Sequence, residues 1–349
     1  MARNVKPGSG CFDDVLSKDC NILVLGLGGG ADAQGAYALA RYLQTLEPTA
    51  AVTYGTVKGV KGEEKVQDAY PIPDLNQLLF TQERKHHPQY LHENVGTTDA
   101  PRPRWVGTVL YEQTIPHQKV FGSEVMSPII CRLNVSDPAQ HEKLAHDLYR
   151  LSMQFANKPW DIVVGLDHGG DVLGGIEEGG SGRDIIMSRV LDNMVSNIQK
   201  AGRFLISLHG LCIDGENYCD EMTTKIERMI ERDAYLGRYP ISDLQGWLRP
   251  VCEGMQSTKT PIIMLDALDG KLEVKSHYNR SQPGGERPFQ ESELDVFGEP
   301  VGQLVQCTTR HHQKEDGSKL SGPIIPVKWA TSGYLFDGHI LTNVLRTVQ

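Results

Sequence analysis

The feature that most constrains this chain is an apolar run that breaks into glycines and then resumes with helical spacing, over residues 21–43. Residues 22–25 read Ile-Leu-Val-Leu, which predicts a strand covered on both faces, as in a parallel sheet flanked by helices. From Asp32 onward, small and apolar residues recur every three or four positions, which predicts a helix. The glycines between strand and helix are Gly26, Gly28, Gly29 and Gly30.

This strand, turn and helix predict a binding loop. Glycines allow a sharp turn and a close approach of the backbone to a ligand, and the free N–H groups at a helix N-terminus attract an anion. We therefore expect an anionic or polar small molecule to bind at Gly28, Gly29, Gly30 and Asp32. The alternative is that the glycines only let the helix and strand pack closely.

The loop does not match the known nucleotide signatures. A dinucleotide site needs G-x-G-x-x-G and an acidic residue at the end of the second strand, but the next predicted strand, residues 51–57, contains no acid. No Gly-Lys-Ser/Thr follows the glycines, so a Walker loop is absent as well.

Charge and cysteine usage narrow the class of protein. The formal net charge of −9 argues against a nucleic-acid or acidic-membrane partner. Seven scattered cysteines without a C-x-x-C pair are typical of reduced thiols in the cytoplasm. No apolar run approaches the length of a membrane helix, and residues 1–20 lack a signal-peptide core, so we expect a cytoplasmic protein.

A second group of polar residues follows the strand predicted at residues 161–166. It contains Asp167, Gly169, Gly170 and Asp171. In open α/β sheets, ligands lie beyond the carboxyl ends of the strands, so these residues are expected to share a crevice with the first glycine loop. Asp167 and Asp171 would then bind a metal ion or activate water, and the glycines would contact the ligand.

A glycine-rich segment further along the chain leads into another predicted helix. Ser181 and Arg183 can donate hydrogen bonds to an anion at this helix N-terminus. Asp184 either caps the helix or faces the same crevice.

The next predicted strand along the chain, residues 204–208, ends at His209 and is followed by Asp214. Either side chain can assist proton transfer, which makes both candidate catalytic residues. His209, Cys212 and Cys219 suggest zinc, but no fourth ligand has suitable spacing. Hard carboxylate oxygens favour Mg²⁺ instead, held by Asp32, Asp167 and Asp171.

Two further segments complete the expected organisation. Residues 261–266 are predicted to form another strand, which ends in an acid, Asp266. Residues 59–127 are rich in Pro, Gln, His and Arg and lack a periodic apolar pattern, which indicates an irregular insertion that is either a substrate-covering lid or a surface loop. Strands that alternate with helices predict a single α/β domain over residues 1–349, with a mostly parallel sheet between two helical layers.

Three motifs resemble those of one family, the domain of unknown function 1152 family. They are residues 25–32 (Leu-Gly-Leu-Gly-Gly-Gly-Ala-Asp) with the helix after them, residues 163–173, and the Asp214-Gly215-Glu216 element. The resemblance covers less than half of the chain and does not include residues 59–127. It implies a Rossmann-like three-layer α/β sandwich of uncharacterised activity.

Two functions agree with these patterns. The first is an enzyme, a hydrolase or transferase that uses Mg²⁺ and acts on a phosphorylated or nucleotide-like small molecule. The second is a metabolite-binding or regulatory protein whose acidic loops fix a polar ligand without chemistry. Either protein can form a homo-oligomer.

Overall fold

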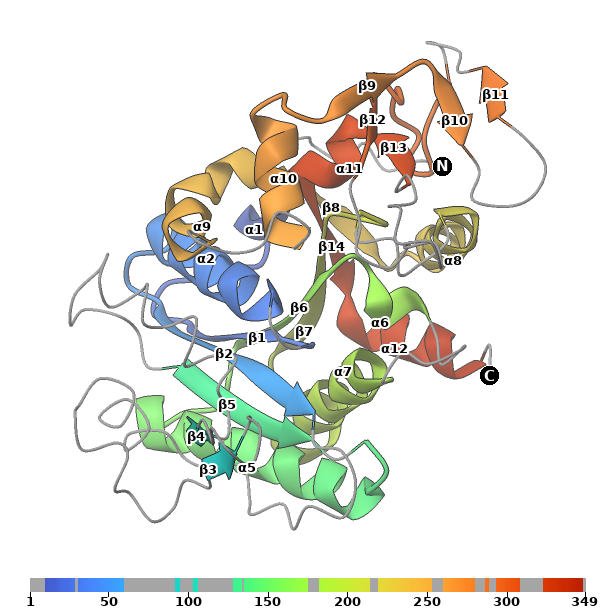
Figure 1. Cartoon of the computed structure of the whole chain (residues 1–349). Helices are drawn as coiled ribbons and strands as arrows, with labels where there is room; N and C mark the ends of the chain where they lie inside the picture. The colour runs from blue at the N-terminus through green and yellow to red at the C-terminus, as the bar shows by residue number, and fades with distance from the viewer. Residues whose placement is uncertain are drawn as a thin grey trace.

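The chain, seen here in a computed structural model, folds around a central sheet of seven strands (Figure 1). The structure describes residues 10–28, 31–59, 92–94, 103–105, 128–133, 135–174, 182–213, 219–252, 260–279, 286–288, 293–307 and 323–347.

The strands of the central sheet lie in the order β5-β2-β1-β6-β7-β14-β8. All neighbours from β5 to β7 pair in parallel, whereas β14 is antiparallel to both β7 and β8. The strands are β1 (Asn21–Gly26), β2 (Ala51–Gly59), β5 (Pro128–Leu133), β6 (Ile162–His168), β7 (Arg203–His209), β8 (Tyr235–Pro240) and β14 (Ser332–Asp337). Without β14, this is the order of a doubly wound Rossmann-like sheet.

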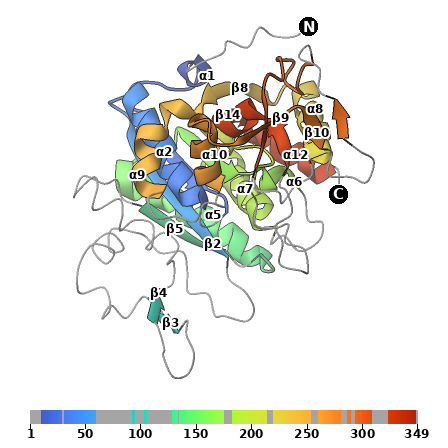
Figure 2. The same ribbon diagram turned by 45° about the horizontal axis from the view of Figure 1, so that its top comes forward.

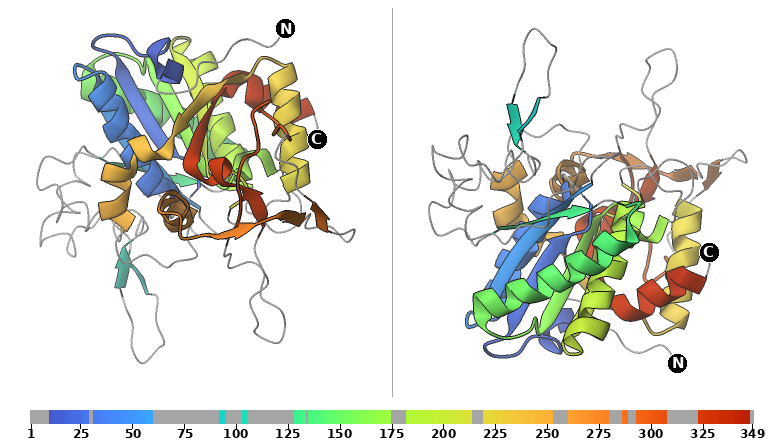
Figure 3. Two further views of the ribbon diagram at one scale, coloured as in Figure 1. Left: turned by 90° about the horizontal axis from the view of Figure 1, so that it is seen from above. Right: turned by 90° about the horizontal axis from the view of Figure 1, so that it is seen from below.

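Helices cover both faces of the sheet, which confirms the predicted three-layer α/β fold (Figure 3). One face carries α2 (Ala31–Leu46), α9 (Gln245–Cys252) and α10 (Thr260–Leu268), and α9 and α10 lie beside α2 (Figure 2). The other face carries α5 (Pro138–Ala156), α7 (Arg183–Asn193) and α12 (Gly338–Thr347). Two layers of helices explain why β1 and β6 are buried at every position.

The remaining helices and the small sheets complete the described chain. The helical ones are α1 (Gly10–Asp13), α6 (Asp171–Gly174), the π-helical η3 (Met194–Gln199), α8 (Cys219–Glu231), the 3-10 turn η4 (Ile241–Asp243) and α11 (Val327–Thr331). The small sheets contain β3 (His92–Asn94), β4 (Pro103–Trp105), β9 (Glu273–Lys275), β10 (His277–Asn279), β11 (Glu286–Pro288), β12 (Leu304–Gln306) and β13 (Ile324–Pro326). None of the described helices is both long and apolar enough to cross a membrane.

The prediction of a strand at residues 261–266 is wrong, because this segment lies within helix α10. Its run of apolar residues has no periodicity that separates a buried strand from a buried helix. The helix packs between α9, α11 and α2 and is buried on most sides. Asp266 therefore lies on a helix and pairs with Lys271 instead of ending a strand.

The predicted insertion at residues 59–127 lies outside the described residues, except for Gly59, β3 and β4. Its role as a lid or a surface loop stays a prediction. All seven cysteines are described, and none of them forms a disulfide.

Strand β14 carries a glycine that lets a tyrosine cross it. Tyr239 on β8 extends its ring over Gly333, and its hydroxyl lies 2.5 Å from both Ser207 Oγ and His209 Nε2 on β7. A methyl group at Gly333 would overlap with the ring, at 2.7 Å from Tyr239 Cε2. The contact joins three strands in the buried core.

Replacing Gly333 by alanine should therefore overpack this contact and lower the free energy of unfolding by about 1–3 kcal/mol. Gly246→Ala is the matched control, because a methyl group at this exposed position of α9 meets no atom within 4 Å. In a helix, that change should be neutral or stabilise by up to about 1 kcal/mol. Urea unfolding of both variants measures the difference, and equal midpoints would contradict the packing argument.

Candidate functional site

The candidate site lies at the carboxyl ends of β1 and β6, where the chain changes the face of the sheet on which its helices pack. After β1 the chain enters α2 on one face, whereas β6 is followed by α6 and α7 on the other. The two strand ends are neighbours, since Leu27 N–H donates to Leu166 O at 2.8 Å. Doubly wound sheets bind their ligands at such a switch point.

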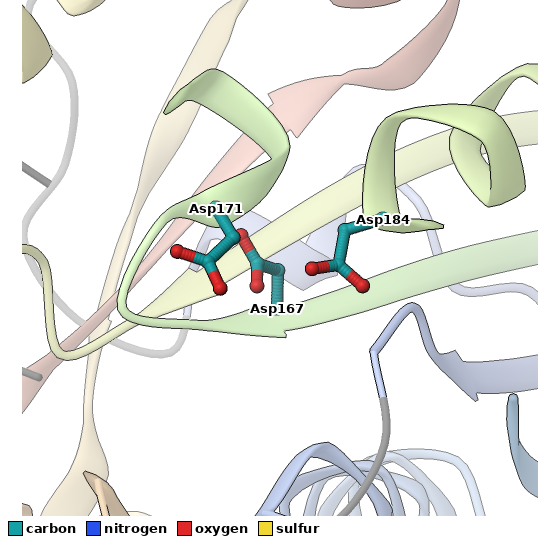
Figure 4. A group of neighbouring side chains, drawn as sticks. All are labelled: Asp167, Asp171 and Asp184. Atoms are coloured by element: carbon teal, nitrogen blue, oxygen red, sulfur yellow. The ribbon is translucent and has the colours of Figure 1, made fainter. Parts of the chain in front are cut away.

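Three carboxylates gather at this edge: Asp167 from β6, Asp171 from the first position of α6 and Asp184 from the first turn of α7 (Figure 4). One oxygen of each lies within 4.8 Å of the others. Asp167 and Asp184 are buried, and Asp171 is partly exposed. We call these three residues the acid cluster.

Burial raises the pKa of Asp167 well above its ordinary value, and the negative charges of Asp171, Asp184 and Asp32 raise it further. The Val172 N–H donates to Asp167 Oδ2 at 2.9 Å and opposes this shift only in part. A cation at the acid cluster would favour the ionised form instead. The site is therefore suited to exchange a proton for a metal ion.

Gly28 lies against the acid cluster and against Asp32. Its N–H donates to Asp32 Oδ2 at 2.7 Å, and Thr56 Oγ1 donates to its carbonyl at 3.2 Å. A methyl group at Gly28 would overlap with Asp32 Oδ2 and lie 2.9 Å from Asp184 Oδ1. Close contacts with the chain's own side chains thus require glycine at this position. This agrees with the alternative considered for the sequence, in which the glycines allow close packing.

Asp32 itself is not a member of the acid cluster. Besides Gly28, its carboxylate accepts hydrogen bonds from His168 N at 3.2 Å and His168 Nδ1 at 3.1 Å. The two predicted metal ligands that the structure brings together are Asp167 and Asp171, and Asp184 is their third partner. The predicted loop residues Gly29 and Gly30 lie outside the described residues.

The glycines after β6 are explained by backbone conformation. Gly169 and Gly170 have φ angles of 92° and 100°, which residues other than glycine rarely adopt. They turn the chain from His168 into α6, so that Asp171 faces Asp167. Their predicted contact with a ligand stays a prediction.

The N-terminus of α7 places a positively charged side chain, Arg183, beside the acid cluster. Gly182 occupies the N-cap position without a side-chain hydrogen bond, and Arg183 and Asp184 follow it. Arg183 Nε lies 3.6 Å from Asp184 Oδ1, and a methyl group at Gly28 would lie 3.3 Å from Arg183 Nη2. Ser181, the other predicted donor, lies outside the described residues.

The histidines at the strand ends face away from the acid cluster. His168 follows Asp167 on the same strand, so the two side chains point to opposite faces, and His168 packs against Gly35 of α2. His209 is paired with His168 and is completely buried. The rings of His168 and His209 lie 5.2 Å apart, measured between their centroids.

Burial lowers the pKa of His209, and the nearby His168 lowers it further. Its Nε2 is occupied by the Tyr239 hydroxyl. These surroundings are those of a neutral core histidine, and its role in proton transfer stays a prediction. Asp214, the other candidate for that role, lies outside the described residues.

Sequence reasoning missed Asp184 as a member of the acid cluster and overlooked His168 and Tyr239. The signal for Asp184 was its place after a glycine-rich lead-in to a helix, beside Arg183. For Tyr239 no signal existed, because its strand was not predicted.

Comparison with known proteins assigns the chain to a family. The family described as protein of unknown function (DUF1152) matches residues 23–280, which is most of the chain. The chain therefore belongs to the DUF1152 family. No curated protein and no solved structure matches it.

The raised pKa of Asp167 predicts a pH dependence of stability. A carboxyl whose pKa is higher in the folded than in the unfolded chain contributes stability at low pH and loses it as pH rises. Asp167→Asn cannot titrate, and its amide oxygen can still accept from Val172 N–H. In EDTA, the stability of this variant relative to the natural protein should therefore increase from pH 5 to pH 8.

Urea unfolding at several pH values measures this difference. A difference that stays constant or falls with pH would show that Asp167 is ionised at all of them.

Proposed function

We propose that this protein is a Mg²⁺-dependent enzyme, a hydrolase or transferase, that acts on a phosphorylated or nucleotide-like small molecule. The observation that carries the proposal is the acid cluster, with its three carboxylate oxygens within 4.8 Å of one another at the carboxyl edge of a doubly wound sheet.

The charge of the acid cluster favours a divalent cation as its partner. Carboxylates this close repel one another, and a hard cation relieves the repulsion through oxygen coordination. Mg²⁺ typically keeps several waters and combines one or two carboxylates with substrate phosphates. A phosphate-bearing substrate would thus complete the coordination of an ion at Asp167, Asp171 and Asp184.

Arg183 supports an anionic substrate beside the cation. Its guanidinium lies at the N-terminus of α7, next to Gly28 and Asp184, and it is a quarter exposed. A guanidinium and helix N–H groups both favour phosphate. A bound cation supplies charge neutralisation and a water molecule of lowered pKa, and the ionised carboxylates of the cluster hold that cation in place.

A metabolite-binding or regulatory protein without catalysis is the second candidate. It is favoured by the surroundings of the strand-end histidines, because His168 is bound to Asp32 and His209 to Tyr239. Neither imidazole faces the acid cluster as a general base would.

The proposal includes a cytoplasmic location and allows a homo-oligomer, with no nucleic-acid or membrane partner. The seven cysteines form no disulfide, which supports a reducing compartment. The net charge of −9 supports the exclusion of nucleic acid.

A thermal-shift screen with Mg²⁺, Mn²⁺, nucleotides and sugar phosphates tests the binding part of the proposal. A cation at 100 times its Kd should stabilise the protein by about 2.7 kcal/mol. Asp171→Asn should abolish this shift. Asp266→Asn, which removes a carboxylate on α10 that pairs with Lys271, should retain it.

Turnover assays of the stabilising compounds separate the two candidates. For the enzyme, Asp171→Ala should abolish product formation while the Tm falls only slightly, because Asp171 is partly exposed. Stabilisation without product in the natural protein would favour the binding protein. A large loss of Tm in Asp171→Ala would make this carboxylate structural.

A further inference from the structure

The starting point is the buried contact between Asp32 and His168, which the acid cluster does not include. The carboxylate of Asp32 accepts three hydrogen bonds, from Gly28 N, His168 N and His168 Nδ1, at 2.7, 3.2 and 3.1 Å. The side chains of Asp32 and His168 are 8% and 1% exposed. Because a carboxylate only accepts, Nδ1 of His168 carries the proton in this contact.

Helix α2 is shaped to receive the His168 ring. Gly35 lies one turn after Asp32, on the same side of the helix. A methyl group at Gly35 would overlap with His168 Cε1 and lie 2.8 Å from its Nε2. Asp32, through its hydrogen bond, and Gly35, through its lack of a side chain, thus fix the position and orientation of the imidazole.

Gly28 is held from a second side as well. Thr56 Oγ1, from β2, donates to the Gly28 carbonyl at 3.2 Å, while Asp32 accepts from its N–H. The peptide groups on either side of this residue are therefore fixed by side chains of β2 and α2, and His168 anchors Asp32 to β6. This arrangement, Thr56, Asp32 and His168 around Gly28, is called the clamp below.

Gly28, which the clamp holds, lies close to the N-terminus of α7. A methyl group at Gly28 would lie 2.9 Å from Asp184 Oδ1 and 3.3 Å from Arg183 Nη2. A shift of Gly28 would consequently displace Asp184, one of the three acids of the cluster. Side chains behind the direct ligands of a metal commonly control its affinity in this way.

We infer that Asp32 and His168 are positioning residues, which fix Gly28 against Asp184 and Arg183 and so set the geometry of the acid cluster without contacting the bound molecule. The inference rests on the proposed function for its effect on cation binding. The clamp itself is independent of any ligand.

Two substitutions of His168 separate hydrogen bonding from packing. His168→Asn keeps an N–H donor near the position of Nδ1, whereas His168→Leu fills a similar volume without a donor. His168→Leu should lower the affinity for Mn²⁺, measured by electron paramagnetic resonance, about 10-fold. His168→Asn should stay within about 3-fold of the natural protein on the same scale.

The amide of Gly28 reports on the clamp without any ligand. Labelling with ¹³C-carbonyl leucine and ¹⁵N-glycine selects glycines that follow a leucine, which are Gly26, Gly28, Gly174 and Gly237. Leu27→Ile identifies Gly28 by removing its signal. The Gly28 amide should exchange slowly in the natural protein and in His168→Asn, and about 10-fold faster or more in His168→Leu.

Thr56→Val provides a second variant if His168→Leu does not fold, since it loosens the clamp from β2 without touching His168. It should also speed exchange at Gly28 and weaken Mn²⁺ binding. Unchanged exchange and affinity in folded His168→Leu or Thr56→Val would overturn the inference. A loss in His168→Asn as large as that in His168→Leu, or larger, would overturn it too, because the hydrogen bond that only His168→Asn keeps would then have no effect.

Failure of the proposed function gives a different result. If the natural protein binds no Mn²⁺, the proposed function and the effect of the clamp on cation binding are both overturned. Exchange at Gly28 then decides whether Asp32 and His168 position the loop.

Discussion

The fold brings three carboxylates to one edge of the sheet, and their mutual repulsion determines the electrostatic properties of the site. Asp167 is almost fully buried beside Asp171 and Asp184, with Asp32 close enough to raise its pKa further. Such a cluster has two stable conditions: a proton is retained on a carboxyl, or a cation is bound. A chain that gained nothing from these acids would be more stable with neutral residues in their place, which is why we interpret the cluster as functional.

The parallel sheet produces this convergence. Residues 167 and 168 project to opposite faces of β6, so one strand end supplies Asp167 to the acid cluster and His168 to the clamp. Helices α2 and α7 then approach the same edge from the two faces, and Gly28 lies where their N-terminal turns meet. Gly28 therefore serves close packing between the chain's own groups, whereas contact of Gly29, Gly30, Gly169 and Gly170 with a ligand stays a prediction.

Local patterns were sufficient for the parts of the fold that are continuous in sequence. The strand at residues 21–26, the helix that follows it, and the strands β6 and β7 all carry strong local signals. Strands β8 and β14 do not, because they are stabilised by pairing with residues far away in the chain. The apolar run of α10 fits a buried helix as well as a buried strand. The role of Asp184 was left open for a related reason: an acid in the first turn of a helix is a common stabilising feature, and only tertiary contacts place it beside Asp167.

Calorimetric titration of the protein with Mn²⁺ at pH 6, in buffers of different ionisation enthalpy, tests the exchange of a proton for a cation most directly. The account predicts binding of one ion with a net release of protons, since burial and neighbouring charges favour the protonated carboxyl of Asp167 and a bound cation favours its ionised form. Absence of binding, or binding whose heat does not depend on the buffer, would contradict it.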